Sequence, residues 1–285
     1  MGIDLAGSAF IAGMITRFVI APLDVIKIRS QVTSSSAFPI KGQVKTIFEK
    51  EGLFGFWKGN ASAELLYGSY SLVQMTTYKK LRDSRLVENG NLNNFISGAL
   101  AGMLATAITF PFDVLRTRFA IQTTPVYISI PHAISTILKE EKFGFFKGLT
   151  PSLIAIVPYM GITFASYEYY RKILTKSESK FNTDLLSGAL AGFSGKLATY
   201  PLDTLRKRMQ VQGPRLQDFL HTIELPNYVK LRHQTNSFMS SFAVRIIQEI
   251  YRKEGMKGFY RGVKPALIKA VIGSALTFSL TNFLK

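Results

Sequence analysis

The chain has 285 residues, and its 35 Lys and Arg outnumber its 18 Asp and Glu to give a net charge of +17. The basic residues stand singly or at the edges of apolar stretches and form no continuous basic face with stacking aromatics, so no nucleic acid partner is expected. The lack of cysteine excludes disulfides, a thiolate nucleophile and cysteine-ligated zinc. No nucleophile–base constellation or glycine-rich phosphate loop is found either. We therefore expect neither an enzyme nor a cofactor, but a protein that meets anionic lipids and an anionic solute.

Six apolar stretches follow one another along the chain, each close to the ~20 residues that span a bilayer as a helix. In chain order they are residues 5–23, 61–78, 95–112, 152–167, 185–202 and 266–284. Polar segments separate them, and three of these segments are predicted to hold a short helix, at 43–49, 133–140 and 243–253. The sequence therefore predicts an all-α membrane protein with six transmembrane helices.

Two sequence patterns recur three times. The first contains a proline, an aspartate and two basic residues: PLDVIKIR from Pro22, PFDVLRTR from Pro111 and PLDTLRKR from Pro201, 89 and 90 residues apart. The second is aromatic, basic and glycine: FGFWKG ending at Gly59, FGFFKG at Gly148 and KGFYRG at Gly262. The third interval is longer by about 25 residues, which indicates a loop insertion at about 213–237. We infer three two-helix repeats, 1–88, 89–178 and 179–285.

A proline inside a helix bends it, so three such helices can converge at one end and form a basket with a closed floor. The two patterns, present three times from about Gly7 to Lys285, resemble those of the mitochondrial carrier family. This resemblance implies three pseudo-symmetric repeats around a central aqueous cavity, in one chain that works as a monomer in the mitochondrial inner membrane with both termini cytoplasmic. Repeat two departs from the family pattern, because Glu141 replaces a glycine and weakens the second pattern there.

Charges just beyond each proline can pair between repeats. Threefold pseudo-symmetry predicts Asp24 with Arg116, Asp113 with Arg206 and Asp203 with Lys27, and the family resemblance implies that this ring closes the matrix side. Three water-accessible pairs would supply about 1 to 3 kcal/mol, which substrate binding can outweigh. The alternative is six helix-end charges solvated independently. The family also places a bracing glutamine nine residues after the proline; Gln31 and Gln210 fit, and Ala120 does not.

The resemblance implies a second, cytoplasmic gate at the far end of the second helix of each repeat. Its residues here are Tyr78, Arg82, Tyr167, Glu168, Arg171 and Lys285. Only Arg82 and Glu168 have complementary charges in different repeats, so we predict a weak cytoplasmic gate and a resting state closed on the matrix side.

Arg17, Lys196 and Lys269 are predicted to face the cavity, because ionisable side chains at membrane depth usually serve function. Three cations around one aqueous space would bind phosphate oxygens; alternatively, they snorkel or pair locally. The family's substrate contact positions correspond to Leu66, Tyr67, Ala155, Ile156, Lys269 and Ala270.

The cargo expected from these residues is a diphosphate joined to a flat heterocycle. Tyr67 can stack on such a ring, and Glu64 either meets a cationic ring or is a helix-entry charge. Ala155 differs by a methyl group from the glycine typical of adenine-nucleotide carriers. Stretches such as FWKGNASAELLYGSY resemble the fungal members that carry thiamine pyrophosphate, which implies exchange of that compound or a related phosphorylated thiamine or nucleotide. The alternatives are a carrier of another phosphorylated coenzyme and a basic membrane-associated nucleic-acid-binding protein.

The second pattern also predicts contacts with cardiolipin, because helix N-termini and a nearby cation suit a lipid phosphate. The residues are Trp57, Lys58, Gly59, Phe146, Lys147, Gly148, Tyr260, Arg261 and Gly262. The alternative is that they provide turn and capping chemistry.

Overall fold

A computed structural model describes residues 5–33, 40–84, 87, 89–141, 143–174, 180–213 and 239–283. The described elements are all helical. Six run along the bundle, and we call them the long helices: α1 (Leu5–Val32), α3 (Asn60–Asp83), α4 (Gly90–Ile121), α6 (Leu149–Leu174), α7 (Lys180–Gln210) and α10 (Val263–Phe283). Between them lie α2 (Ile40–Glu51), α5 (Ile130–Glu140), α9 (Met239–Phe259) and the short 3-10 helices η1 (Leu53–Trp57) and η2 (Gly144–Phe146).

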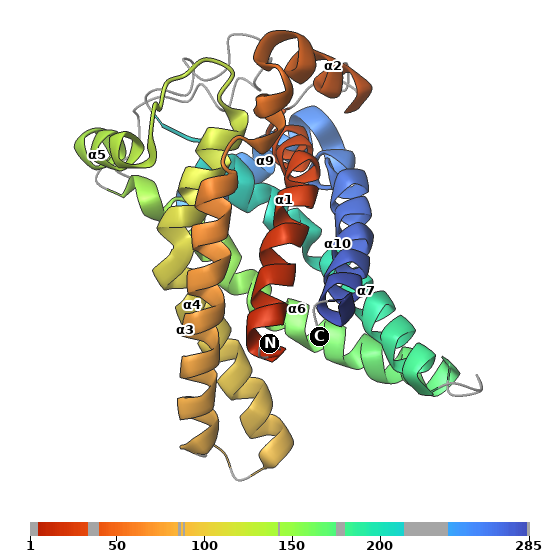
Figure 1. Ribbon diagram of the computed structural model, residues 1–285. Coiled ribbons are helices and arrows are strands. Elements are labelled where there is room, and N and C mark those ends of the chain that lie inside the picture. Colours follow the sequence, from red (N-terminus) through yellow and green to blue (C-terminus); the bar gives the residue numbers. More distant parts are fainter. Residues whose placement is uncertain are drawn as a thin grey trace.

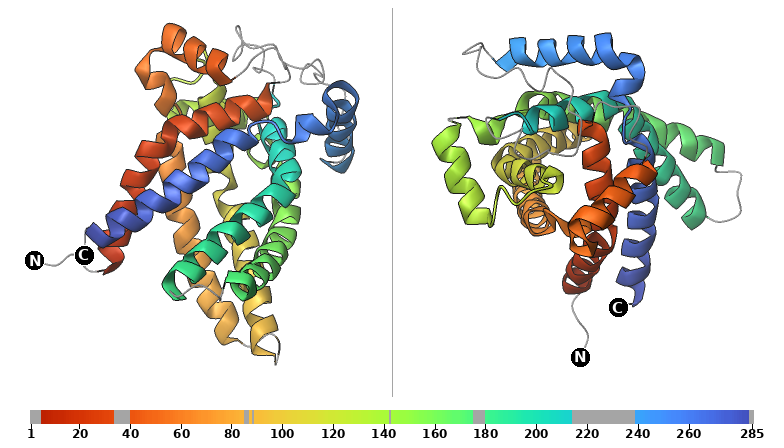
Figure 2. Two further views of the ribbon diagram at one scale, coloured as in Figure 1. Left: turned by 90° about the vertical axis from the view of Figure 1, so that its right-hand side faces the viewer. Right: turned by 90° about the horizontal axis from the view of Figure 1, so that it is seen from above.

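The long helices pack in three pairs, α3 with α4, α6 with α7, and α10 with α1. Each pair thus joins the second long helix of one predicted repeat to the first of the next, so the chain closes on itself (Figures 1 and 2). The helices α2, α5 and α9 lie at one end of the bundle, and both chain termini lie toward the other (Figure 1). We call these the converging end and the terminal end.

Prolines lie inside α1, α4 and α7, at Pro22, Pro111 and Pro201. These three helices contact one another, and the helix pairs spread apart toward the terminal end (Figures 1 and 2). The main hydrophobic core also lies at the converging end, where residues such as Ile28, Leu115 and Met209 are almost fully buried. The expected basket of bent helices is therefore present.

The outer faces of the long helices carry large apolar side chains. Phe18, Leu72, Ile108, Phe164 and Val271 each expose more than half of their surface, as expected for residues that face lipid. Within the described residues, Leu92–Ile121 and Gly144–Leu174 are long and apolar enough to span a membrane by composition alone. Helices α1 and α7 are longer than a bilayer requires but carry internal charges near their prolines.

The helices extend beyond the apolar stretches from which they were predicted. Helix α1 continues nine residues past the predicted end of 5–23, because a charged helix remains stable when its charges find partners. The short helices are also longer than predicted at 43–49, 133–140 and 243–253, and the backbone of α9 is non-helical at Gly255 (φ 62°). The predicted insertion at 213–237 lies, apart from Gly213, outside the described residues.

Candidate functional site

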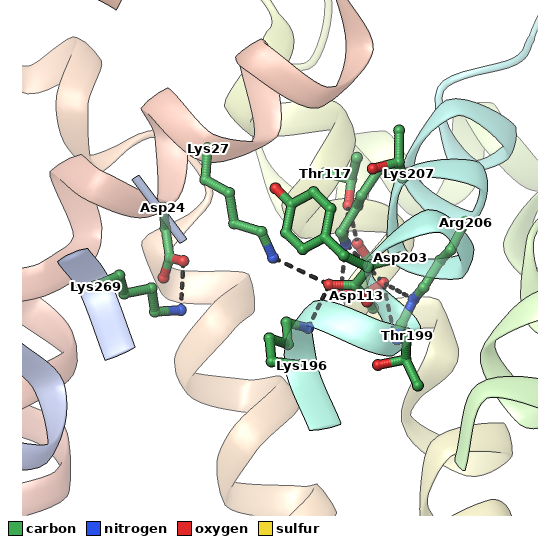
Figure 3. A network of polar contacts seen from close by, with 12 residues as sticks. Asp24, Lys27, Asp113, Thr117, Lys196, Thr199, Asp203, Arg206, Lys207 and Lys269 are labelled. Carbon is green, nitrogen blue, oxygen red and sulfur yellow. Dashed lines mark hydrogen bonds and ion pairs between the residues drawn. The ribbon is translucent and has the colours of Figure 1, made fainter. Parts of the chain in front are cut away.

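Three ion pairs connect α1, α4 and α7 where these helices converge. Each joins an aspartate two residues after the signature proline to a cation of a neighbouring proline helix, as predicted. The distances are 2.6 Å from Asp24 Oδ2 to Arg116 Nη2, 2.8 Å from Asp113 Oδ2 to Arg206 Nη2 and 3.3 Å from Asp203 Oδ2 to Lys27 Nζ. The pairs form a closed ring, which we call the aspartate ring. Figure 3 shows its three aspartates with Lys27 and Arg206.

The aspartate ring is more buried than its prediction assumed. Asp24, Asp113 and Arg116 each expose less than a tenth of their surface. These contacts argue against six independently solvated charges. The small energy expected for water-accessible pairs therefore does not apply to these buried residues. A buried pair contributes little net stability, but removal of one of its partners costs about 3 to 5 kcal/mol.

Each aspartate also has a second cation. Lys269 of α10 pairs with Asp24, and Lys196 of α7 pairs with Asp203. Lys207 lies 2.9 Å from Asp113. Six cations thus surround three carboxylates, so the ring carries an excess of positive charge.

The second cations reach the ring from opposite sides. Helix α7 runs from the terminal end to the converging end, so Lys196 approaches from the terminal end and Lys207 from beyond the ring (Figure 3). Lys207 was not predicted as a site residue. Its signal was the extra basic residue in PLDTLRKR, where the other repeats have Ile28 and Thr117.

The two predicted braces behave differently. Gln210 donates to Asp113 and accepts hydrogen bonds from Thr117 (2.7 Å) and Lys207 (2.9 Å). The side chain of Gln31 is buried, but among the described residues it forms no hydrogen bond to an aspartate of the ring. Ala120 has no side chain that could brace; its carbonyl accepts a hydrogen bond from Arg29 (2.9 Å). The described contacts therefore reinforce one node of the ring, Asp113.

Tyr67 connects the aspartate ring to Arg17. Arg116 donates to its hydroxyl at 2.7 Å, and the guanidinium carbon of Arg17 lies 3.1 Å from the centroid of its ring. The predicted substrate residues Arg17, Tyr67, Lys196 and Lys269 therefore gather at the ring. The other predicted positions differ in exposure: Leu66 is buried, Ala155 and Ile156 are half-buried, and Ala270 is exposed.

A second set of ion pairs, which the sequence analysis did not predict, lies at the converging end. Three buried arginines, seven residues after each signature proline, pair with glutamates at the ends of the short helices or just beyond them. The closest distances are 2.5 Å for Arg29–Glu51, 3.0 Å for Arg118–Glu141 and 2.7 Å for Arg208–Glu254. The Nε of each arginine donates to the neighbouring proline helix, at the carbonyls of Ala120 (2.9 Å), Gln210 (3.1 Å) and Gln31 (2.9 Å). We call these contacts the arginine ring.

The cations predicted to bind cardiolipin belong to the arginine ring. Each pairs with the same glutamate as the arginine: Lys58–Glu51 at 2.5 Å, Lys147–Glu141 at 2.5 Å and Arg261–Glu254 at 3.0 Å. Each also donates to a carbonyl near the end of the next proline helix, namely Gln122 (2.9 Å), Gln212 (3.0 Å) and Thr33 (2.8 Å). These contacts support the alternative of turn and capping chemistry, and lipid contact stays a prediction.

The neighbouring aromatic and glycine residues of the second pattern also make local contacts. Trp57 donates to the Phe18 carbonyl (3.0 Å), Tyr260 stacks on Tyr200, and Phe146 is partly exposed. All three glycines have positive φ: Gly59 (81°), Gly148 (88°) and Gly262 (76°). A Cβ on Gly59 or Gly148 would lie within 2.8 Å of a backbone carbonyl of the next proline helix. Glycine is therefore required there by both backbone conformation and close packing.

Glu141 does not weaken the second pattern in the way expected. Gly52 and Gly255 have φ of 68° and 62°, whereas Glu141 is extended, with φ −141° and ψ 102°. Its carboxylate is the partner of Arg118. Burial raises the pKa of Glu141, but the charges of Arg118 and Lys147 outweigh burial and hold the pKa below its ordinary value. Although repeat two has Glu141 in place of the family's glycine, it keeps the arginine–glutamate pair, with a different backbone conformation at the end of α5.

At the terminal end, the predicted charge pair across repeats, Arg82 with Glu168, is not formed in the described conformation, so the cytoplasmic gate stays a prediction. Arg82 pairs with the adjacent Asp83 (3.2 Å) and lies over Tyr78, and it forms no ion pair with the exposed Glu168 within the described residues. Arg171 pairs with Asp184 at 3.1 Å, and Tyr167 donates to the same carboxylate. Lys285 lies outside the described residues. The helix pairs are spread apart here (Figure 2), and the Arg171–Asp184 contact, which joins repeats two and three, lies within the pair of α6 and α7.

The family described as mitochondrial carrier protein matches residues 3–86, 87–178 and 177–285. A protein of Neurospora crassa named mitochondrial thiamine pyrophosphate carrier 1 is 41% identical, over 93% of this chain and 86% of its own length. Proteins of the same name from Phaeosphaeria nodorum and Aspergillus niger are 40% and 39% identical, each over 96% of this chain and 88% of its own length. The chain belongs to the mitochondrial carrier family, whose members are membrane transporters.

Proposed function

We propose that this protein is a carrier of the mitochondrial inner membrane that exchanges thiamine pyrophosphate, or a related phosphorylated thiamine or nucleotide, by alternating access. The observation that carries this proposal is the aspartate ring, in which six cations surround three carboxylates. The name shared by the compared fungal relatives supports thiamine pyrophosphate as the cargo.

The terminal-end side of the aspartate ring is suited to bind a diphosphate. Arg17, Lys196 and Lys269 lie there, on α1, α7 and α10. Charge-assisted hydrogen bonds to phosphate oxygens are among the stronger polar contacts, and an excess of positive charge attracts polyanions. Leu66 on α3, Ala155 and Ile156 on α6, and Ala270 on α10 would contribute apolar contacts.

The same lysines can couple cargo binding to gate opening. Lys196 and Lys269 pair with Asp203 and Asp24 in the described structure. Phosphate oxygens compete with these two carboxylates for the lysines, so binding of the cargo weakens two of the three nodes of the ring. A ligand shifts a conformational equilibrium by its differential affinity for the two states, and this competition is a source of that difference.

The described conformation corresponds to closure on the matrix side. The aspartate ring, with Gln210 as its brace, forms the matrix gate. The residues of the predicted cytoplasmic gate lie apart, in keeping with its few complementary charges. With six spans and both termini on the cytoplasmic side, a cargo enters from that side and meets Arg17 and Lys196 before the ring.

The same architecture supports our proposal for the membrane, the lipid and the oligomeric state of the carrier. One chain supplies all three helix pairs, so a monomer suffices for transport. The long helices lie in the bilayer, and the aromatic-basic-glycine turns face the matrix leaflet, where cardiolipin phosphates meet helix N-termini.

The test is uptake of labelled thiamine pyrophosphate into cardiolipin-containing liposomes that carry the purified protein and unlabelled internal substrate. We expect saturable exchange in the wild type and loss of most exchange in Lys269→Ala. Glu49→Gln, which changes an exposed charge on α2, is the matched control and should exchange as the wild type does. Exchange of other nucleotides without thiamine pyrophosphate would overturn the cargo. Tight, salt-sensitive RNA binding with no flux of any phosphate compound would overturn transport itself.

A further inference from the structure

Glu64 and Tyr67 lie one turn apart on α3, beside the aspartate ring. Glu64 is partly exposed and feels the positive charges of Arg17 and Arg116. Yet its carboxylate has no ion-pair partner within 4.0 Å in the described part of the chain. This distinguishes Glu64 from the three aspartates of the ring, each of which has two cations.

The dipole of α3 does not account for Glu64. Helix α3 begins at Asn60, so Glu64 is its fifth residue, and the stabilisation of a carboxylate by a helix N-terminus falls off within the first turn. The pseudo-symmetry does not account for it either. The residues at the same distance from the aromatic-basic-glycine turn in the other repeats are Leu153 and Leu267.

The face of Tyr67 already holds a planar cation. The guanidinium carbon of Arg17 lies 3.1 Å from the ring centroid, a close cation–π contact. A guanidinium is flat and delocalised, as a charged aromatic heterocycle is. The described protein therefore shows that this ring face accepts a flat cation beside the Glu64 carboxylate.

We propose that Glu64 and Tyr67 form a subsite for the positively charged ring of a diphosphate ester, and that Arg17 fills this subsite while the carrier is empty. The inference rests on the proposed function and specifies which part of the cargo is selected. When the cargo enters, its diphosphate draws Arg17 toward the phosphate oxygens, and the cationic ring takes the place of Arg17 on Tyr67. The tyrosine face keeps a cation throughout, so the exchange avoids an unpaired charge.

This subsite gives the carrier a means of discrimination. A thiazolium ring gains both the cation–π contact and the attraction of Glu64, whereas a neutral heterocycle gains neither. Specificity is a difference of affinities, and an unpaired carboxylate in the site also disfavours a ligand that offers it no positive charge.

The experiment compares two cargoes that differ in ring charge. The first is thiamine pyrophosphate, and the second is its 3-deaza analogue, in which a neutral thiophene replaces the thiazolium. Exchange of each is measured in liposomes for the wild type and Glu64→Gln. We expect the apparent KM for thiamine pyrophosphate to rise about fivefold in Glu64→Gln and that of the neutral analogue to change by less than about twofold.

Two further variants isolate the ring face. Tyr67→Phe keeps the aromatic face but loses the hydroxyl that accepts from Arg116, so it should retain the preference for the charged cargo. Tyr67→Leu should lose that preference. Glu49→Gln controls for the loss of a negative charge elsewhere and should leave both KM values unchanged.

The outcomes separate this inference from the proposed function. Equal changes for both cargoes in Glu64→Gln, or no change for either, would overturn the subsite while thiamine pyrophosphate transport stands. Failure of the wild type to exchange thiamine pyrophosphate would overturn the cargo and the subsite together.

Discussion

The two ends of the bundle use similar residues in opposite ways. At the converging end, two layers of charges are buried or largely buried, and each connects neighbouring helices. At the terminal end, Arg82 and Arg171 each bind a nearby carboxylate and stay about half exposed. Exposed pairs contribute about 0 to 1 kcal/mol, whereas breaking a buried pair by removing one partner costs several times more. The number of charges therefore says less about a gate than their burial does.

The two rings of the converging end also differ from each other. The aspartate ring contains Lys196 and Lys269, which a polyanion can reach and detach. The arginine ring is built from arginines that are almost fully buried and that donate to helix carbonyls as well as to glutamates. A phosphate ligand has no comparable route to these arginines. We infer that the aspartate ring is the part that cargo regulates, and that the arginine ring holds the proline helices in register.

The largest effect on stability is expected from removal of an arginine of the arginine ring. Arg208→Ala leaves Glu254 with one cation instead of two and removes the link to the Gln31 carbonyl. We expect a loss of about 3 kcal/mol or more in the free energy of unfolding, because buried partners are left unpaired. The thermal midpoint of the purified protein, followed by intrinsic fluorescence, measures it.

The matched control for this variant is Lys45→Ala, which breaks the exposed pair with Glu49 on α2. Its cost should be about 0.5 kcal/mol or less, since it is a solvated i,i+4 pair. If Arg208→Ala should fail to accumulate, Arg208→Lys keeps the charge without the forked geometry and is expected to fall between the two. Equal thermal midpoints for Arg208→Ala and Lys45→Ala would contradict the contrast between buried and exposed charges.

A second large effect is expected where the chain departs from its family. Glu141→Gly restores the glycine of the family pattern, yet it removes the carboxylate that pairs with Arg118 and Lys147. We expect a loss of about 2 to 4 kcal/mol, because Arg118 is buried and loses its ion-pair partner. The thermal midpoint checks this, with Glu140→Gly as the control for glycine at the end of α5. A more stable Glu141→Gly protein would show that the family pattern, and not the Arg118 contact, determines this turn.

The sequence predicts the arrangement of the helices better than it predicts where each helix ends. The threefold recurrence from Pro22, Pro111 and Pro201 predicts the helix pairs and the convergence, because a proline in a helix and a repeat both constrain geometry. The helices were predicted to be too short, because an apolar stretch ends at its first charged residue whereas the backbone hydrogen bonds of the helix continue. In the sequence alone, charged residues that form ion pairs inside a helix cannot be told from charged residues at the end of a helix.

The candidate site was only partly predictable for a similar reason. Pseudo-symmetry identifies the three aspartate pairs, since each repeat supplies one donor and one acceptor. It does not identify Lys207, which exists in one repeat only. It also fails for Glu141, whose role depends on where α5 ends, and for Arg82, whose partner depends on how far apart the helices stand.

An intermediate effect is expected from Lys207→Thr, which introduces the residue found at the same place in repeat two. Asp113 keeps Arg206 and Gln210 but loses its second cation. We expect the closed state to lose about 1 to 3 kcal/mol, as for a buried hydrogen bond to a charged group. In liposomes without internal substrate, labelled thiamine pyrophosphate should therefore enter faster than with the wild type. The KM for exchange should change by less than about twofold.

Lys196→Ala is the comparison for that variant, because Lys196 reaches the ring from the side on which cargo arrives. It should raise the KM for cargo as well as weaken the ring, since one residue serves both interactions. A KM that rises equally in Lys207→Thr and Lys196→Ala would mean that the two sides of the ring are not distinct.

The smallest effect is expected at the terminal end, from Arg82→Ala. Arg82 touches Asp83 and Tyr78 while about half exposed, so its loss should change the thermal midpoint by about 1 °C or less, which corresponds to a few tenths of a kcal/mol. The informative measurement is exchange rate with cargo on both sides. If a cytoplasmic gate forms during the cycle through Arg82 and Glu168, Arg82→Ala and Glu168→Gln should slow exchange equally, and the double variant should be no slower than either. Additive effects would instead show that the two residues act separately, and that the terminal end closes through packing and without an ion pair.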